Sequence, residues 1–177
     1  MSKKQVVYPK AQMISEENAV EYVLERFEDV KKSNKIKDLV AFQAMNKYMM
    51  MVHDQSELKI LGNFVASYKK IQFSEILSEY EKHLKKSFEN KPTIKKHSNV
   101  ILHIFGYFSS DFSQQEKEKF FELLAQYKNE KLSIGEILAE INPIIYRFNN
   151  TYLASQTYFL LYSNPQPGNI FEMLSKK

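Results

Sequence analysis

The chain has no cysteine and very little glycine. Without cysteine there can be no disulfide, thiolate nucleophile, iron–sulfur cluster or cysteine-ligated zinc site. Only four of the 177 residues are glycine, about 2% against a usual ~7%. This scarcity excludes a glycine-rich dinucleotide or P-loop site and leaves few tight hairpin turns. No Gly-x-Ser-x-Gly turn presents a serine nucleophile, so the sequence favours a binding protein over an enzyme.

Long apolar runs are also missing. The longest, 100–108, is interrupted by His103 and is far shorter than the roughly 20 residues of a membrane span. The opening residues lack the apolar stretch of a signal peptide. We therefore expect a cytoplasmic protein with no membrane association. Residues 1–14 are predicted to be a mobile polar lead-in to a single domain over residues 15–177.

The sequence does contain strong helical periodicity. Its 44% hydrophobic and 26% charged residues are typical of one soluble globular domain, and apolar positions recur at helical rather than strand spacing. We predict an all-α fold, a single compact bundle of seven or eight helices. The predicted helices begin at Ser15, span 36–53 and 56–68, begin at Ser74, span 93–108, begin at Ser113 and Ser133, and span 151–162.

Several residues mark where these helices begin and end. Ser113–Glu116 and Ser133–Glu136 have the capping-box form, in which a hydroxyl and a carboxylate each accept from a backbone N–H of the first turn. Pro143 lies inside the pattern that begins at Ser133, so a kink or break is expected there. Pro165 and Pro167 are expected to end regular structure.

A cluster of lysines precedes and enters the predicted helix 93–108. Six lysines and one acid, Glu89, lie within residues 82–97. Such a cluster attracts phosphate, although lysine lacks the bidentate fork of arginine. The alternative is an ordinary solvated face. The cluster consists of Lys82, Lys85, Lys86, Lys91, Lys95 and Lys96.

The helix predicted at 93–108 also carries a polar stripe. At about 100° per residue its members fall within about 80° of one another, and His97 falls on the opposite, core-facing side. Gly106 borders the stripe and would let a backbone or ligand approach closely. The stripe suits phosphate and base-edge contacts with stacking, or else it bridges neighbouring helices through buried hydrogen bonds. It consists of Lys96, Asn99, His103 and Tyr107.

The four histidines do not form a metal-binding pattern. His97 and His103 diverge around their helix, and His53 and His83 lie on other helices. A metal site would need tertiary convergence, so we predict no metal and no cofactor. His53 falls on an apolar helical face, where a satisfied core histidine is the usual role. A small-molecule or enzymatic site around His53, His97 and His103 stays an alternative.

Several segments occur together in a distinctive order. They are Leu39–Phe42, Lys47–His53, Leu61–Gly62, His97–Val100 with His103, Gly106–Phe108, and Tyr152–Leu153 with Gln156 and Tyr158. The most specific is the His-x-Asn-Val-x-x-His-x-x-Gly-Tyr-Phe pattern that begins at His97. Over roughly residues 20–165 the chain resembles the YbgA-like family, whose function is unknown.

The resemblance implies a role in RNA binding. Members of the family also occur fused behind a tRNA thiouridine desulfidase domain, where this part is thought to help bind tRNA. The resemblance singles out His53, Lys96, His97, Asn99, His103, Gly106, Tyr107 and, as a further motif residue, Gln156. Two positions depart from the family: Asn46, where histidine is frequent, and the ending Leu161–Pro165.

We therefore predict a non-catalytic RNA-binding domain, with tRNA as the expected RNA, accessory to tRNA thiouridine metabolism. Phosphate contacts from the lysine cluster would make binding strongly salt-dependent. The alternative partner is a protein, such as a separately encoded desulfidase that the domain recruits. The residues predicted to contact RNA are Lys82, Lys85, Lys86, Lys91, Lys95, Lys96, Asn99, His103 and Tyr107.

Overall fold

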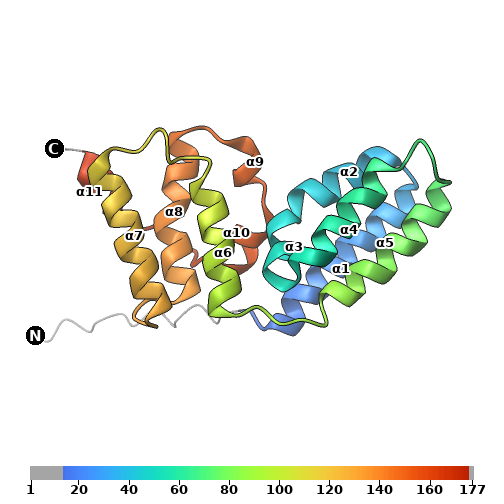
Figure 1. Ribbon diagram of the computed structural model, residues 1–177, viewed down its shortest axis with the longest axis horizontal. Coiled ribbons are helices and arrows are strands. Elements are labelled where there is room, and N and C mark those ends of the chain that lie inside the picture. Colours follow the sequence, from blue (N-terminus) through green and yellow to red (C-terminus); the bar gives the residue numbers. More distant parts are fainter. Residues whose placement is uncertain (1–13, 176–177) are drawn as a thin grey trace, which may run out of the picture.

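A computed structural model describes residues 14–175, and within them all regular structure is helical, which confirms the predicted all-α class. Figure 1 shows an elongated arrangement with α1, α2, α4 and α5 at one end, α7, α8 and α11 at the other, and α3 between them. The helices are α1 (Glu16–Ser33), α2 (Ile36–Met45), α3 (Lys47–His53), α4 (Gln55–Ala66), α5 (Phe73–Ser87), α6 (Ile94–Phe105), α7 (Gln114–Lys128), α8 (Ile134–Arg147), α9 (Thr151–Ala154), α10 (Thr157–Tyr162) and α11 (Ile170–Ser175).

One hydrophobic cluster of buried side chains runs through both ends of the molecule. Helix α5 shows how the sequence produces it, because Ile76, Leu77, Tyr80 and Leu84 recur at helical spacing and are all buried. Each such side chain stabilises the fold by about 1.5–3 kcal/mol when fully buried. Burying this face turns the lysines of α5 outward. Among residues 14–175 no helix combines the length and apolar character that crossing a membrane requires.

The helix starts predicted at Ser15, Ser113 and Ser133 are confirmed by their caps, whereas the helix predicted to begin at Ser74 begins at Phe73. The Ser15 hydroxyl accepts a hydrogen bond from the backbone N–H of Asn18 at the start of α1. Both capping boxes are complete, Ser113 with Glu116 at α7 and Ser133 with Glu136 at α8. Replacing such a cap with alanine typically costs about 1 kcal/mol, so these short polar signals stabilise the helices that they begin.

The helix predicted over 36–53 is divided into α2 and α3 at Asn46. There the Asn46 side chain donates to the Phe42 carbonyl over 2.9 Å. Gln156 lies at the break between α9 and α10, where one helix was predicted over 151–162. Its Nε2 donates to the Ala44 carbonyl over 2.6 Å, and its Oε1 accepts from the Tyr48 N–H over 3.4 Å. One amide thus joins the two helix breaks.

Two predictions at the prolines are wrong: that Pro143 could break its helix, and that Pro165 and Pro167 end regular structure. Helix α8 continues through Pro143 without a break. Proline offers no N–H to the carbonyl four residues back, and that carbonyl, of Ala139, accepts instead from the Gly168 N–H over 2.9 Å. Regular structure also resumes after Pro167 as α11, whose Phe171 ring stacks on Phe112 at 5.6 Å.

The predicted lead-in, residues 1–14, falls almost wholly outside the described residues. Its last residue, Ile14, is described, and it packs partly buried against the hydrophobic core. Ile14 immediately precedes Ser15, the residue that caps α1.

Candidate nucleic-acid interface

Five of the six clustered lysines are exposed. They lie on the last two turns of α5, in the connection that follows, and on the first turn of α6. In Figure 1 these segments lie along one edge of the molecule, where α5 ends and α6 begins. The periodicity of α5 explains why its lysines are exposed, since its apolar face packs in the core. We call this group the lysine surface: Lys82, Lys85, Lys86, Lys91 and Lys95.

Two members of the lysine surface are paired with carboxylates. The Lys85 ammonium lies 3.1 Å from Glu81 Oε1, and the Lys86 ammonium lies 3.4 Å from Glu57 Oε1. Partial burial raises the pKa of Glu81, but hydrogen bonds from Lys31 and Lys85 outweigh that effect and hold it below its usual value. Among the described residues, Lys82, Lys91 and Lys95 form no ion pair, so their full charge is available to an anion.

Glu57 is the residue that sequence reasoning missed. It lies on α4, its side chain is buried, and its Oε2 is 2.7 Å from Nδ1 of His83. The same carboxylate is the partner of Lys86. It thus holds two basic side chains of α5 at the edge of the lysine surface. No local signal identifies it, because its partners are 26 or more residues away and depend on how α4 packs against α5.

Lys96 is half-buried, and its ammonium bridges two backbone carbonyls. Its ammonium donates to the His53 carbonyl over 2.9 Å and to the Lys91 carbonyl over 3.1 Å. It therefore closes the C-terminal end of α3, whose last carbonyls have no partner within the helix. These two bonds use two of the three ammonium N–H donors, so a phosphate contact from Lys96 would be made through the third.

The polar stripe divides into a bridging half and an exposed half. Asn99 is half-buried, and its Nδ2 donates to Oε1 of Gln55 at the start of α4 over 3.1 Å. Lys96 and Asn99 therefore bridge to neighbouring segments, but through exposed and part-buried hydrogen bonds and not the buried ones of the alternative interpretation. His103 and Tyr107 are exposed at the far end of α6, with Tyr107 packed 6.1 Å from the Tyr152 ring.

Gly106 does not receive another segment of the chain. A Cβ built there would meet only carbonyl oxygens of α6 itself, with His103 O nearest at 3.2 Å. The backbone has ordinary helical angles at this residue. The close approach predicted at Gly106 is therefore not made by any described residue of this chain.

The buried histidines are separate from the exposed one. His97 lies in the core, as predicted, with Nδ1 2.6 Å from the Tyr158 hydroxyl. Burial, and secondarily repulsion from His53, lowers the pKa of His97 to about 4. His53 is buried at the end of α3, and His103 is exposed on α6. The three imidazoles do not converge on one pocket, and within residues 14–175 no three metal-ligating side chains are grouped to hold an ion.

A hollow between α6 and α7 adjoins the lysine surface. Its volume is about 520 Å³, within the range of small-molecule and nucleotide-sized sites. Ile94 and Leu102 offer apolar area and are 38% and 40% exposed. Asn99 offers an amide, while Lys95 and Lys128 supply positive charge. The hollow could therefore hold a planar base with its phosphate outside.

The chain matches known proteins over most of its length. Residues 47–163, about two thirds of the chain, match the family described as "Protein of unknown function (DUF1722)". The chain is also 23% identical over 125 residues to the "Uncharacterized protein YbgA" of Escherichia coli (strain K12), which covers 70% of this chain and 74% of that protein. No solved structure matches. The family match runs from α3 to α10 and includes the lysine surface and the hollow.

Proposed function

The chain belongs to the DUF1722 family of YbgA-like proteins of unknown function, and we propose that it is a non-catalytic domain that binds structured RNA, with tRNA as the ligand. The observation that carries the proposal is that Lys95, one of the three unpaired lysines, lines the α6–α7 hollow, while Lys82 and Lys91 lie exposed on the segments that precede it in the chain. Lys82, Lys91 and Lys95 would contact phosphates, and the hollow would accept an unstacked base.

The chemistry of the surface supports RNA over a small anion. Lysines spread over three consecutive segments match a backbone with repeating phosphates better than they match one compact anion. Single-stranded RNA bases stack on apolar and aromatic groups and bond through their edges, which Ile94, Leu102 and Asn99 would provide. The proposal includes a role in tRNA thiouridine metabolism, because the chain resembles domains that are fused to desulfidases. It also includes the cytoplasm as the compartment.

Removing the unpaired charges should weaken tRNA binding by roughly tenfold. The variant Lys82→Gln/Lys91→Gln/Lys95→Gln deletes three exposed ammonium groups without breaking an ion pair. Fluorescence anisotropy of a labelled tRNA transcript, titrated at two salt concentrations, measures both affinity and salt dependence. The negative slope of log K against log salt should become shallower by about 2, because each lost phosphate contact reduces its magnitude by up to about 0.9.

The matched control carries the same change in charge at a distance from the lysine surface. Lys32 and Lys37 are exposed on α1 and α2, and Lys70 is exposed in the connection between α4 and α5. Their triple replacement by glutamine should change affinity less than twofold. Equal weakening in the two triple variants, or binding that is insensitive to salt, would remove the lysine surface as the interface.

A further inference from the structure

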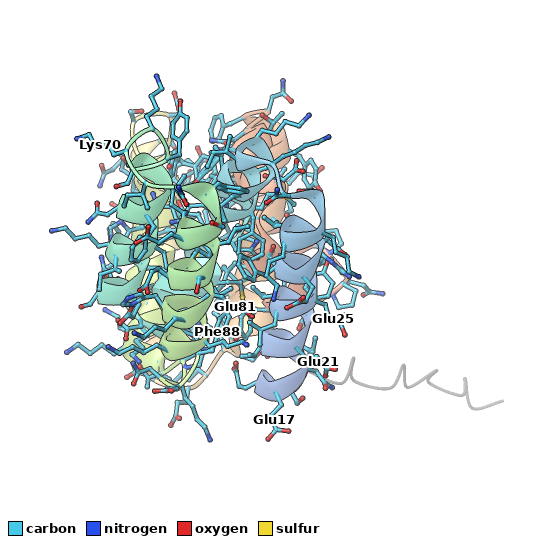
Figure 2. All side chains as sticks on the ribbon, turned by 90° about the vertical axis from the view of Figure 1, so that its right-hand side faces the viewer. Glu17, Glu21, Glu25, Lys70, Glu81 and Phe88 are labelled. Atoms are coloured by element: carbon cyan, nitrogen blue, oxygen red, sulfur yellow. The ribbon has the colours of Figure 1, made fainter. Side chains whose placement is uncertain are left out.

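A groove lies between α1 and α5, and Lys85 and Lys91 of the lysine surface are among the residues that line it. Its volume is about 590 Å³. In Figure 2, Phe88 and Glu81 lie between the two helices, and Glu17, Glu21 and Glu25 follow one another along α1. The floor is apolar, with one imidazole among hydrocarbon side chains. It is formed by Val20, Leu24, Phe88, Pro92 and His53.

The α1 wall of the groove is a column of carboxylates. Glu17, Glu21 and Glu25 repeat every four residues, which places them about 6 Å apart along the helix. Among the described residues Glu17 and Glu21 form no ion pair. Glu25 forms a long one, with 3.9 Å between its carboxylate and the Arg26 guanidinium. Like charges at this spacing destabilise a helix by a few tenths of a kcal/mol per pair. A bound cation would relieve that repulsion.

The groove is negative although the chain is positive. Five carboxylates line it, the column together with Glu16 and Glu28, against two ammonium groups, Lys85 and Lys91, which gives a net charge of −3. The whole chain has a formal charge of +4. Lys85 is held by Glu81, and Glu28 is in turn held by Lys31, so the unpaired negative charge comes mainly from the column. The wall thus attracts cations and repels the phosphates that the lysine surface would attract.

His53 adds an unused hydrogen-bond acceptor to the floor. The side chain is 1% exposed, and Nδ1 is 2.8 Å from the Asn90 carbonyl. A carbonyl only accepts, so Nδ1 carries the proton, and the neutral ring leaves Nε2 as an acceptor. Burial lowers the pKa of His53, which favours this neutral form. Among residues 14–175 Nε2 has no hydrogen-bond partner, and an unsatisfied buried acceptor costs about 1–3 kcal/mol.

We propose that the α1–α5 groove binds a linear aliphatic polyamine. Its ammonium groups would pair with Glu17, Glu21 and Glu25, and a three- or four-carbon spacer covers the distance between adjacent carboxylates. The methylenes would pack on Val20, Leu24 and Phe88, and one terminal ammonium would donate to His53 Nε2. A divalent metal fits less well, because no three ligands are grouped there among the described residues. The proposal does not depend on RNA binding.

Isothermal titration of the full chain with spermidine tests the proposal. We expect a sub-millimolar dissociation constant, weakened roughly tenfold in Glu17→Gln/Glu21→Gln. Both glutamates are exposed, so the variant should fold, and its melting temperature verifies this. The matched control is Glu118→Gln/Glu122→Gln, an exposed pair with the same spacing on α7, which should bind like the parent chain.

Three comparators and one spectrum decide the outcome. n-Octylamine, trilysine and Mg²⁺ should each bind at least tenfold more weakly than spermidine, since each lacks either the charges or the plain methylene spacers. The ¹⁵N resonance of His53 Nε2 should shift on spermidine binding, while those of His103 should not. Equal affinity in the two double variants, a comparator that matches spermidine, or an unmoved His53 Nε2 signal would overturn the proposal.

Discussion

Lowering the pH from 7 to 4 should destabilise the folded chain by about 3 kcal/mol through His97. The pKa of His97 is about 4 in the folded chain and about 6.5 when unfolded. Above pH 6.5 neither state is protonated, and the stabilisation is complete. Between pH 6.5 and 4 His97 is protonated in the unfolded chain but stays neutral in the folded chain, so the free energy of unfolding falls. Below pH 4 the loss from His97 levels off.

The cause of this sensitivity is local and can be removed. His97 is enclosed by Tyr158, Tyr162 and Tyr127, whose rings lie 5.1–6.4 Å from the imidazole. No carboxylate of the described residues is hydrogen-bonded to it, so none offsets the desolvation of the imidazolium. Burial lowers the pKa of His53 as well, so His53 also makes the folded chain less stable as the pH falls.

Urea denaturation at several pH values measures the effect. The parent chain should lose stability steadily from pH 6.5 downward. His97→Phe should start less stable, because Tyr158 loses its partner, but should show a much flatter dependence on pH. His103→Gln, at an exposed position, should behave as the parent chain does. An undiminished pH dependence in His97→Phe would contradict the assignment.

Gln156→Ala should lower the free energy of unfolding by about 3 kcal/mol. The side chain is 2% exposed and makes two hydrogen bonds to backbone groups more than 100 residues away, in α2 and α3. Truncation leaves the Ala44 carbonyl and the Tyr48 N–H without these bonds and opens a cavity. A motif residue suggested by family resemblance thus has a structural role at the junction of α2, α3 and α10.

Thermal and urea unfolding of Gln156→Ala provide the measurement. Gln115→Ala is the matched control, since Gln115 is exposed on α7, and it should change stability by less than about 0.5 kcal/mol. Hydrogen exchange should also show faster opening of α10 in Gln156→Ala. A loss no greater than that of the control would show that the two helix breaks do not depend on this amide.

The helices were predictable because their signals are local. Capping residues and apolar spacing located the starts of α1, α7 and α8, and the apolar face of α5 determined which way its lysines point. The interruptions were not predictable, because distant groups cause them. The continuity of α8 through Pro143 depends on Gly168, and the α2–α3 break is joined to Gln156.

The same distinction applies to the candidate site. Helical geometry placed His97 in the core and the exposed side chains of His103 and Tyr107 on the polar stripe, as observed. It could not show that Lys96 is bound to two carbonyls, because α3 and the connection before α6 supply them. The buried Glu57 and the α1–α5 groove likewise arise only from packing between helices.

Lysine acylation followed by mass spectrometry, with and without bound tRNA, tests the central claim most directly. An amine-reactive reagent modifies exposed ammonium groups, and a phosphate contact protects them. The account predicts that tRNA protects Lys82, Lys91 and Lys95 while Lys32, Lys37 and Lys70 stay reactive. Uniform protection across both sets, or unchanged reactivity of Lys82, Lys91 and Lys95 in a saturated complex, would contradict it.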